Sequence, residues 1–530
     1  MSERARMFPR TIRRTLIVTL AAASLAAGCT PPPAPPKPPP PAKHVEPPPV
    51  VTAAPVVPER ETPPESGPAR ELTLPAPAWA TLANGLQVAA ITSNALPIVQ
   101  IRVVALAGAA MDGDKPGLAS LTAQLLKDGG AGGMSSRDLL ERVESLGATL
   151  DITTSFDRTT LSIAVTKDQF AEALELVAAV AQKPTLKEAE LTKLRKRAID
   201  DASDAARTDG MWAASMMLYK GLYGASPYAT FDATAADLGK ITHADVKAFH
   251  KKFFAPKNMF VVVAGDVTTD EVNTATEKAF GTVTGGEAPA RVAAPVTQPG
   301  ALSITLVDRP KSTQSDVLAG VLGPERTSAD WPSFAVANQI LGGGVASRLF
   351  LEVREKSSLA YRTNSALTEL AHAPAPMIAY VGTRSAKTGL AVQALLAQID
   401  RLGSAAPADE EVATATRFLS DVAAIRLETV GAMANELAKN HTLGLPDDTP
   451  AVFRKAVRSV TAAEAAKAAS THVHVANTVL VVAGDAKIVG PMLSHFGEVK
   501  VVDPMKSFAV TSTLPKNPAA VLELPDEAGK

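Results

Sequence analysis

The sequence predicts an α+β protein whose body consists of two tandem homologous domains. Three observations carry this prediction. β-Branched runs alternate with helical periodicity, several segments recur in both halves of the chain, and prolines crowd one region near the start. That region, residues 31–70, holds 17 of the 41 prolines, a density that a packed core does not tolerate. The chain therefore divides into a front segment without a core and a globular body.

The composition limits what the body does. The chain has 530 residues, of which 46% are hydrophobic, so its size allows three or four domains. Lys and Arg number 53 against 54 Asp and Glu, and this balance argues against nucleic-acid binding, which needs a basic surplus. One cysteine is present, which excludes an intramolecular disulfide and a Cys-based zinc site.

The first 29 residues have the pattern of a secretory signal. A basic start is followed by an apolar run from Thr15 to Gly28, too short to cross a bilayer as a helix. The run ends in Leu25-Ala26-Ala27-Gly28-Cys29, which resembles a bacterial lipobox, where the cysteine is acylated. We therefore expect residues 1–29 to be a lipoprotein signal peptide with Cys29 as the lipidation site.

The proline-rich segment follows directly. Because proline fixes φ and removes a donor, residues 30–70 are expected to form an extended linker, which is a spacer rather than a domain. Thr30 stands where an Asp would indicate retention at the inner membrane. The expected location is thus the bacterial cell envelope, lipid-anchored, at the outer membrane facing the periplasm.

An internal repeat defines the body. The recurring segments are, in pairs, Asn258–Asp266 and Asn477–Asp485, Ile241-Thr242 and Val460-Thr461, and Ser136-Arg137 and Ser347-Arg348. The first pair reads NMFVVVAGD against NTVLVVAGD, and each member of the other pairs precedes a helical pattern. Two copies of one domain explain these matches better than chance does.

Each copy mixes strands and helices. Ile98–Leu106 and Phe260–Ala264 are β-branched runs, and Asn84-Gly85 is a hairpin signal. Helical spacing covers three further segments, 139–146, 170–180 and 186–202. We expect domains at 71–285 and 301–505, an interdomain linker at 286–300, and a tail at 506–530.

The order of segments resembles one known family. The first half reads TLANGLQV (81–88), GAAMDGDKPGLASLTAQLLKDGG (108–130) and YGASPYATF (223–231), and the second reads LGGGVASRLFLEVREKSSLAY (341–361). This order resembles the insulinase/pitrilysin metallopeptidases (inverted zincins), which include the mitochondrial processing peptidase. The resemblance implies two LuxS-like or processing-peptidase-like domains, each a mostly antiparallel sheet with helices packed on one face.

The zinc motif of that family is missing. In active members a helix after the Gly-Leu pair carries His-x-x-Glu-His, which places two imidazoles on one helix face with a general base between them. Here Ser120, Ala123 and Gln124 stand at the ligand and base positions, and Asp200 aligns with the family's third ligand. Ser and Gln are poor zinc ligands and Ala accepts no proton, so we expect no metal on this chain. The remaining histidines are expected to be solvated or core residues.

The second half keeps other family residues. In the family an Arg and a Tyr of the C-terminal domain reach over a neighbouring zinc site, and Arg354 and Tyr361 match those positions. The resemblance implies that Arg354 holds substrate backbone or a carboxylate and that Tyr361 donates to an oxyanion. The alternative is structural: Arg354 pairs with Glu352 or Glu355, and Tyr361 packs in the core.

These observations give a leading hypothesis and two alternatives. The leading hypothesis is a lipid-anchored, non-metal subunit of a periplasmic two-component zinc peptidase that cleaves peptides or unfolded segments. Its partner is expected to be a homologous subunit that carries the zinc in a heterodimer, although a homodimer stays open. The alternatives are an inactive scaffold or peptide-binding lipoprotein with the same fold, and a peptidase active alone.

Overall fold

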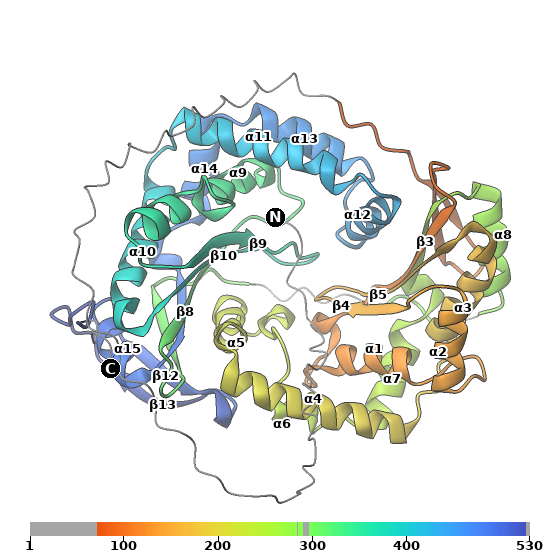
Figure 1. The fold of residues 1–530 in the computed structure, drawn as a ribbon, viewed down its shortest axis with the longest axis horizontal. Helices are drawn as coiled ribbons and strands as arrows, with labels where there is room; N and C mark the ends of the chain where they lie inside the picture. Colours follow the sequence, from red (N-terminus) through yellow and green to blue (C-terminus); the bar gives the residue numbers. More distant parts are fainter. Residues whose placement is uncertain (1–70, 284, 290–295, 526–530) are drawn as a thin grey trace, which may run out of the picture. The chain divides into compact units, whose positions relative to one another are not determined.

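The computed structural model describes residues 71–283, 285–289 and 296–525, all within one compact unit of residues 71–530. Cys29, the predicted signal peptide and the predicted proline-rich linker lie outside the described residues. The described chain forms two β-sheets, each covered by helices (Figure 1). Within this part of the chain, the helices fall short of the length and apolar character that a membrane-spanning segment requires.

The first sheet comes from the first half of the chain. Its described strands run in the order β1-β2-β6-β3-β5-β4, and among them only β2 and β6 are parallel neighbours. The strands are β1 (Ala78–Thr81), β2 (Gln87–Thr92), β3 (Ile98–Ala105), β4 (Asp151–Thr154), β5 (Thr159–Thr166) and β6 (Met259–Gly265).

The second sheet comes from the second half. Its described strands run in the order β13-β12-β7-β11-β8-β10-β9, with β7 parallel to both β11 and β12. The strands are β7 (Ser303–Asp308), β8 (Gln314–Leu322), β9 (Arg362–Leu367), β10 (Pro376–Arg384), β11 (Val479–Gly484), β12 (Val499–Asp503) and β13 (Ala509–Leu514).

The two sheets share a five-strand core. The order β2-β6-β3-β5-β4 in the first sheet matches β7-β11-β8-β10-β9 in the second. The repeated segments fall on equivalent elements, because NMFVVVAGD contains β6 and NTVLVVAGD contains β11. Thr242 and Thr461 both cap a helix through a reciprocal capping box. The predicted tandem repeat of one α+β domain is therefore confirmed.

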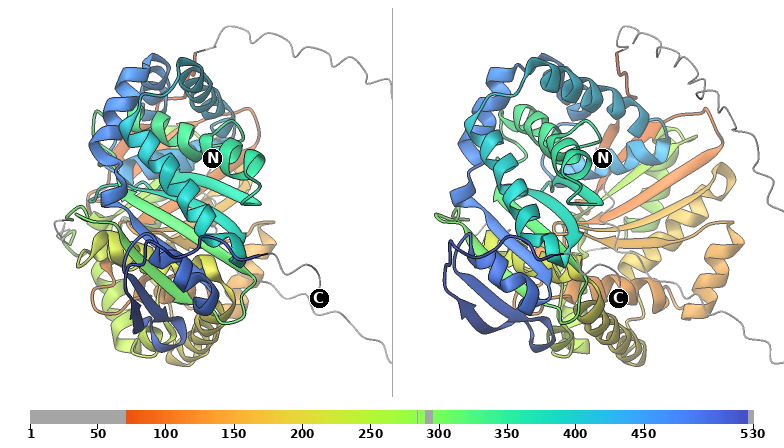
Figure 2. Two further views of the ribbon diagram at one scale, coloured as in Figure 1. Left: turned by 90° about the vertical axis from the view of Figure 1, so that its left-hand side faces the viewer. Right: turned by 60° about the vertical axis from the view of Figure 1, so that its left-hand side comes forward.

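Each half contributes a set of helices, and most of them lie on the side of that half's own sheet. Those of the first half are α1 (Leu118–Asp128), α2 (Ser136–Ser145), α3 (Phe170–Gln182), α4 (Glu188–Thr208), α5 (Gly210–Tyr223), α6 (Ala235–Leu238), α7 (His243–Phe253) and α8 (Thr269–Phe280). Those of the second half are α9 (Trp331–Gly342), α10 (Thr388–Ser404), α11 (Asp409–Arg426), α12 (Val430–Thr442), α13 (Thr449–Ser459), α14 (Ala462–His472) and α15 (Ala486–Ser494). Figure 2 shows α9 and α10, in green and cyan, beside the strands of the second sheet.

One helix of each half packs on the sheet of the other half. Helix α5 packs on β8 and β11 of the second sheet, whereas α12 packs on β3 and β6 of the first (Figure 1). Leu218 and Leu222 of α5 are almost fully buried, and they lie against Gly320 of β8, where a Cβ would come within 3.0 Å of both side chains. Helices therefore lie on both faces of each sheet. The sequence predicted helices on one face only, and the second face is covered by a helix from the other half.

The predicted elements correspond to observed ones with small shifts at their ends. The β-branched runs are β3 and β6, and the three segments with helical spacing are α2, α3 and α4. Asn84-Gly85 forms the turn between the antiparallel strands β1 and β2, with Gly85 at φ 89°. Because that φ lies in the left-handed region, glycine fits the turn at low cost.

The second half extends beyond the predicted boundary at residue 505. Strand β13 pairs antiparallel with β12 and closes one edge of the second sheet. Residues 509–514 therefore belong to the domain rather than to a tail. The sequence AVTSTL is short and mostly exposed, so it lacks the buried apolar pattern that identifies a strand.

Candidate functional site

Helix α1 carries the positions that the family resemblance aligns with the zinc motif. It begins after Gly117, whose φ of 89° requires glycine, and the carboxylate of Asp112 fixes this start. Asp112 accepts hydrogen bonds from the amides of Gly117 and Ala119, both at 2.7 Å. Burial raises the pKa of Asp112 to about 7, the backbone donors oppose this rise, and nearby Asp232 adds to it.

The predicted zinc-motif positions offer no ligand set. Ala123 is buried, Ser120 is partly buried and Gln124 is exposed. Asp200 is exposed on α4, a helix that packs on α1. Within the described residues, no group of three His, Cys, Asp or Glu side chains is arranged to hold a metal. A hydroxyl, a methyl and a carboxamide do not fit the zinc of the family.

The two histidines of α7, His243 and His250, both contact backbone carbonyls. The Nε2 atom of His243 contacts the carbonyl of Leu186, and that of His250 contacts the carbonyl of Ala181. Burial lowers the pKa of His250. Both rings hold α7 against neighbouring segments, which is a structural role.

The structure brings Arg354 and Tyr361 together. Arg354 lies on η5 (Leu349–Lys356), a short π-helix, and Tyr361 directly precedes β9. The guanidinium lies 5.6 Å from the ring centre of Tyr361 and 4.6 Å from that of Phe350. Such cation–π contacts orient the charge without neutralising it.

The pair is open to solvent. Tyr361 is 82% exposed, so it does not pack in the core as the structural alternative required. Arg354 contacts Glu355 at 3.4 Å, with about a third of the Arg354 side chain exposed, as that alternative expected. An exposed phenol beside a partly exposed guanidinium provides adjacent donors for an oxyanion or a carboxylate.

Residues outside the predicted site position η5. Arg348 is buried and bonds Glu411 of α11 through two atoms, at 2.7 and 2.9 Å. Leu349 and Val353 are fully buried on the same short helix. The recurrence of Ser-Arg in both halves marked Arg348 as a repeat residue, but its ion pair required the tertiary structure.

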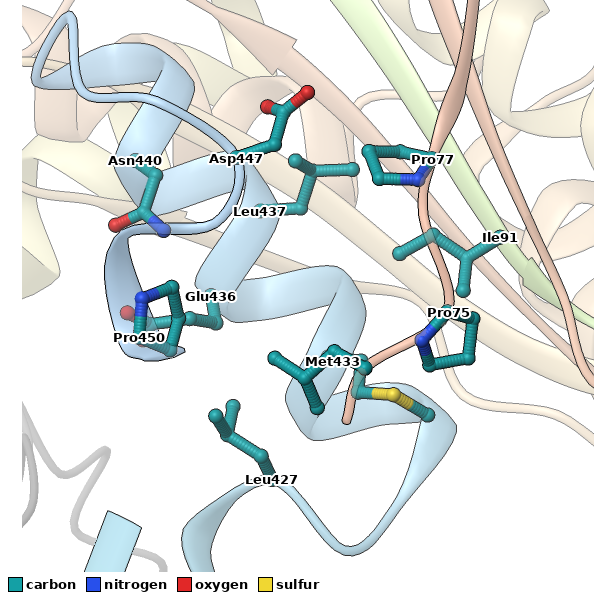
Figure 3. Close-up of a pocket in the computed structure, with 11 residues that line it drawn as sticks. Pro75, Pro77, Ile91, Leu427, Met433, Glu436, Leu437, Asn440, Asp447 and Pro450 are labelled. Atoms are coloured by element: carbon teal, nitrogen blue, oxygen red, sulfur yellow. The ribbon is translucent and has the colours of Figure 1, made fainter. Parts of the chain in front are cut away.

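A small pocket lies elsewhere in the described chain (Figure 3). Its lining comes from residues 74–77, Ile91, α12 and the segment that leads into α13, and its volume is about 30 Å³. Asn440 is fully buried there, and its amide atoms find no hydrogen-bond partner among the described residues. The volume suits one or two water molecules. None of the predicted site residues lines this pocket.

The fold and the candidate site together indicate a two-domain protein of peptidase type. Two tandem domains carry a peptidase-type helix without metal ligands and an exposed Arg–Tyr pair on the second domain. Family comparison identifies the same class. The description "Insulinase (Peptidase family M16)" matches residues 87–229, and "Peptidase M16 inactive domain" matches residues 240–419.

Individual relatives agree. An uncharacterized zinc protease of Streptomyces coelicolor is 28% identical over 218 residues, which cover 39% of this chain and 46% of the relative. The non-peptidase homolog YmxG of Helicobacter pylori is 23% identical over 347 residues, covering 64% of this chain and 78% of that protein. The alignments with the zinc proteases of Streptomyces and Mycobacterium span about half of those relatives' length or less.

Solved structures share the fold. A peptidase M16 inactive domain from Pseudomonas fluorescens superposes with a TM-score of 0.71 at 27% identity, covering 77% of this chain and 98% of that one. A protease from Helicobacter pylori gives a TM-score of 0.72 at 20% identity, covering 78% and 100%. The chain belongs to the insulinase family of peptidases, as a homologue that lacks the family's zinc ligands.

Proposed function

We propose that this chain is the non-metal subunit of a two-component zinc peptidase that cleaves peptides or unfolded segments. The observation that carries the proposal is the pair of Arg354 and Tyr361, which lie side by side on a domain whose described residues hold no set of metal ligands. An exposed donor pair without a metal beside it is suited to act on a site that another chain completes.

The chemistry of the pair supports this role. The guanidinium of Arg354 recognises a carboxylate or a peptide carbonyl, and the phenol of Tyr361 donates one hydrogen bond. Donors of this kind stabilise negative charge that develops on oxygen during acyl transfer. Neither residue removes a proton or holds a metal, so the pair assists a reaction and does not perform one alone.

Zinc is then held by a homologous partner subunit, and this chain binds no cofactor itself. The names of the relatives fit such a division. The chain is similar to a protein named zinc protease PqqE and to one named non-peptidase homolog YmxG, both of Helicobacter pylori. Because this chain has no zinc ligands at the motif positions, it fits the description of a non-peptidase homolog better than that of a zinc protease.

The N-terminus supports a location in the cell envelope. In this proposal Cys29 carries the lipid anchor, the proline-rich linker separates the anchor from the enzyme body, and the body faces the periplasm from the outer membrane. Replacement of Cys29 by Ser should move the full chain from the membrane fraction to the soluble fraction. Membrane attachment that survives C29S would contradict the anchor.

Reconstitution tests the enzymatic role. The partner is a homologous chain with His-x-x-Glu-His intact, sought first in the reading frame adjacent to this one. The full chain is mixed with that zinc subunit and a panel of unstructured peptides, and cleavage is compared with that of each subunit alone. We expect cleavage by the mixture, none by this chain alone, and substoichiometric zinc in this chain by metal analysis.

Two controls sharpen this test. Replacement of the motif Glu of the zinc subunit by Gln should abolish cleavage by the mixture, which assigns the chemistry to the partner. Absence of any gain over the zinc subunit alone would contradict the proposal. Stoichiometric zinc in this chain, with proteolysis by this chain alone, would establish an independent peptidase instead.

A scaffold or peptide-binding lipoprotein is the second candidate. The observation that favours it is the local engagement of Arg354 by Phe350 and Glu355, which would give the residue a structural role. A scaffold predicts that the combined substitution R354A/Y361F leaves both assembly and cleavage unchanged. The peptidase subunit predicts that assembly persists and cleavage is lost.

A further inference from the structure

The tyrosines of the chain gather around one hairpin. The sequence holds five. Tyr361 precedes β9, Tyr380 lies in β10, Tyr219 and Tyr223 lie on α5, and Tyr228 lies on η3 (Pro227–Ala229). The last three belong to the first half, yet their hydroxyls meet the loop that joins β9 to β10 in the second half. This loop, residues 368–375, is called the hairpin tip below.

Two of these tyrosines reach the hairpin tip from α5. The hydroxyl of Tyr223 donates to the carbonyl of Pro374 at 2.7 Å, and that of Tyr219 lies 3.2 Å from the hydroxyl of Thr368. Burial raises the pKa of both phenols, so they stay protonated and able to donate. The hairpin tip is therefore bonded to the helix that the first half lends to the second sheet.

Tyr228 and Asp157 form the most enclosed contact. Tyr228 is 3% and Asp157 is 6% exposed, and the phenol donates to the carboxylate at 2.5 Å. The second carboxylate oxygen accepts from the amide of Ala371 at 3.1 Å. The phenol oxygen accepts from the amide of His372 at 3.2 Å. Two adjacent amides of the hairpin tip thus donate hydrogen bonds to the buried Asp157–Tyr228 pair of the first half.

Charged residues hold the same tip from another side. Glu369 lies 3.2 Å from both Lys439 of α12 and Arg326. Burial alone would raise the pKa of Glu369, but Lys439 and Arg326 outweigh it and hold the pKa below its usual value. Because both exchanged helices, α5 and α12, contact the tip, the loop lies where the two halves are joined.

We propose that Asp157 and Tyr228 are positioning residues for the Arg354–Tyr361 pair. In the described sheet β9 pairs with one strand only, β10, and it also packs on α9. The position of β9 is therefore set by β10, by α9 and by the hairpin tip. Tyr361 directly precedes β9, at the strand's other end from the tip. Fixing the tip to the first half therefore fixes the direction in which β9 presents Tyr361 and, through their contact, Arg354.

Amide hydrogen exchange on the full chain tests the coupling. Tyr228→Phe keeps the buried ring and removes the hydroxyl. We expect exchange at the amides of Ala371 and His372 to rise about tenfold, the factor that corresponds to one net hydrogen bond, with a smaller rise along β9. Asp157→Asn should give the same pattern through loss of the charged acceptor.

Tyr380→Phe is the matched control. It removes a Tyr–Asp hydrogen bond of 2.8 Å, to Asp316, that lies within the second half. We expect the amides of Ala371 and His372 to exchange as in the wild type. Unchanged exchange at these amides in Tyr228→Phe, or an equal rise in Tyr380→Phe, would overturn the proposal.

A kinetic readout rests on the proposed function and separates the two claims. In the reconstituted peptidase, Tyr228→Phe should lower kcat about three- to tenfold with KM unchanged, because mispositioned donors act on the transition state. Tyr380→Phe should leave both constants unchanged. If the wild-type mixture does not cleave, the proposed function fails, whereas the exchange result still decides the coupling. A wild-type kcat in Tyr228→Phe would contradict the positioning role.

Discussion

The two halves share one five-strand core and differ in what they expose at the peptidase site. In the first half, α1 offers Ser120 and Gln124 to the surface and buries Ala123, which leaves no metal ligand. In the second half, η5 and the start of β9 expose a guanidinium and a phenol in contact with each other. In the proposed function, the first half supplies the fold without metal ligands on α1, and the second half supplies the donor side chains that act on the site of a partner.

The largest expected effect is at the exposed pair. Tyr361→Phe should lower kcat of the reconstituted peptidase by about 10²–10³-fold, the usual loss for one oxyanion donor, with little change in thermal stability because the side chain is exposed. Leu351→Ala is the control, since Leu351 is also exposed on η5 and is assigned no role. Steady-state kinetics and melting curves of both variants decide the matter. If Tyr361→Phe and the wild type have equal kcat values, the second half does not contribute Tyr361 to the reaction.

The second prediction concerns what the first half now contributes. Leu218→Ala on α5 should lower the free energy of unfolding by about 2–5 kcal/mol, since the side chain is fully buried against the second sheet. Leu140→Ala, at an exposed position of α2, should change it by less than about 0.5 kcal/mol. Denaturant unfolding compares the two. A small loss for Leu218→Ala would mean that the second sheet does not depend on the first half.

The third prediction is a pH dependence located at α1. Burial raises the pKa of folded Asp112 to about 7 from an ordinary value of 3.8, so its contribution to stability is full below the unfolded pKa. That contribution is lost as the pH rises through about 7, by at most about 1.4 kcal/mol per pH unit. Asp112→Asn should remove this loss between pH 5 and 7. If the free energy of unfolding changes with pH in the same way for the variant and the wild type across this range, the raised pKa of Asp112 is contradicted.

The smallest effect is expected at the degenerate motif. Ser120→Ala and Gln124→Ala should each change stability by less than about 0.5 kcal/mol and should leave cleavage by the mixture unchanged. The measurement is the same melting curve and kinetic assay used for Tyr361→Phe. Loss of cleavage in either variant would show that α1 still takes part in the reaction and would break the contrast between the halves.

Local sequence patterns predicted which segments form helices and strands better than they predicted which surfaces those elements pack against. The β-branched runs became β3 and β6, and the helical spacing over residues 186–202 indicated α4, on which Leu191 and Leu194 are buried. Nothing in the period of α5 shows that its apolar face belongs to the second sheet, because periodicity reports burial and not the surface that provides it. Strand β13 was missed since its residues are mostly exposed.

The candidate site residues came from a resemblance. The resemblance of REKSSLAY to the family's C-terminal domain gave Arg354 and Tyr361 as candidates, and the absence of histidine from α1 is read directly from the sequence. Around their contact lie the π-helix η5, the Arg348–Glu411 ion pair and, in the proposed coupling, the hairpin tip bonded to Tyr228. These are contacts between residues far apart in the chain, which no local pattern contains.

The central claim is that the second half acts in trans on a zinc site of another chain. The most direct measurement is the rate of peptide cleavage by a fixed amount of zinc subunit as the full chain is titrated in. The account predicts that the rate rises and saturates at one chain per zinc subunit, whereas R354A/Y361F binds with the same stoichiometry and gives no rise. A rate that is independent of this chain, or that rises equally with the double variant, would contradict the account.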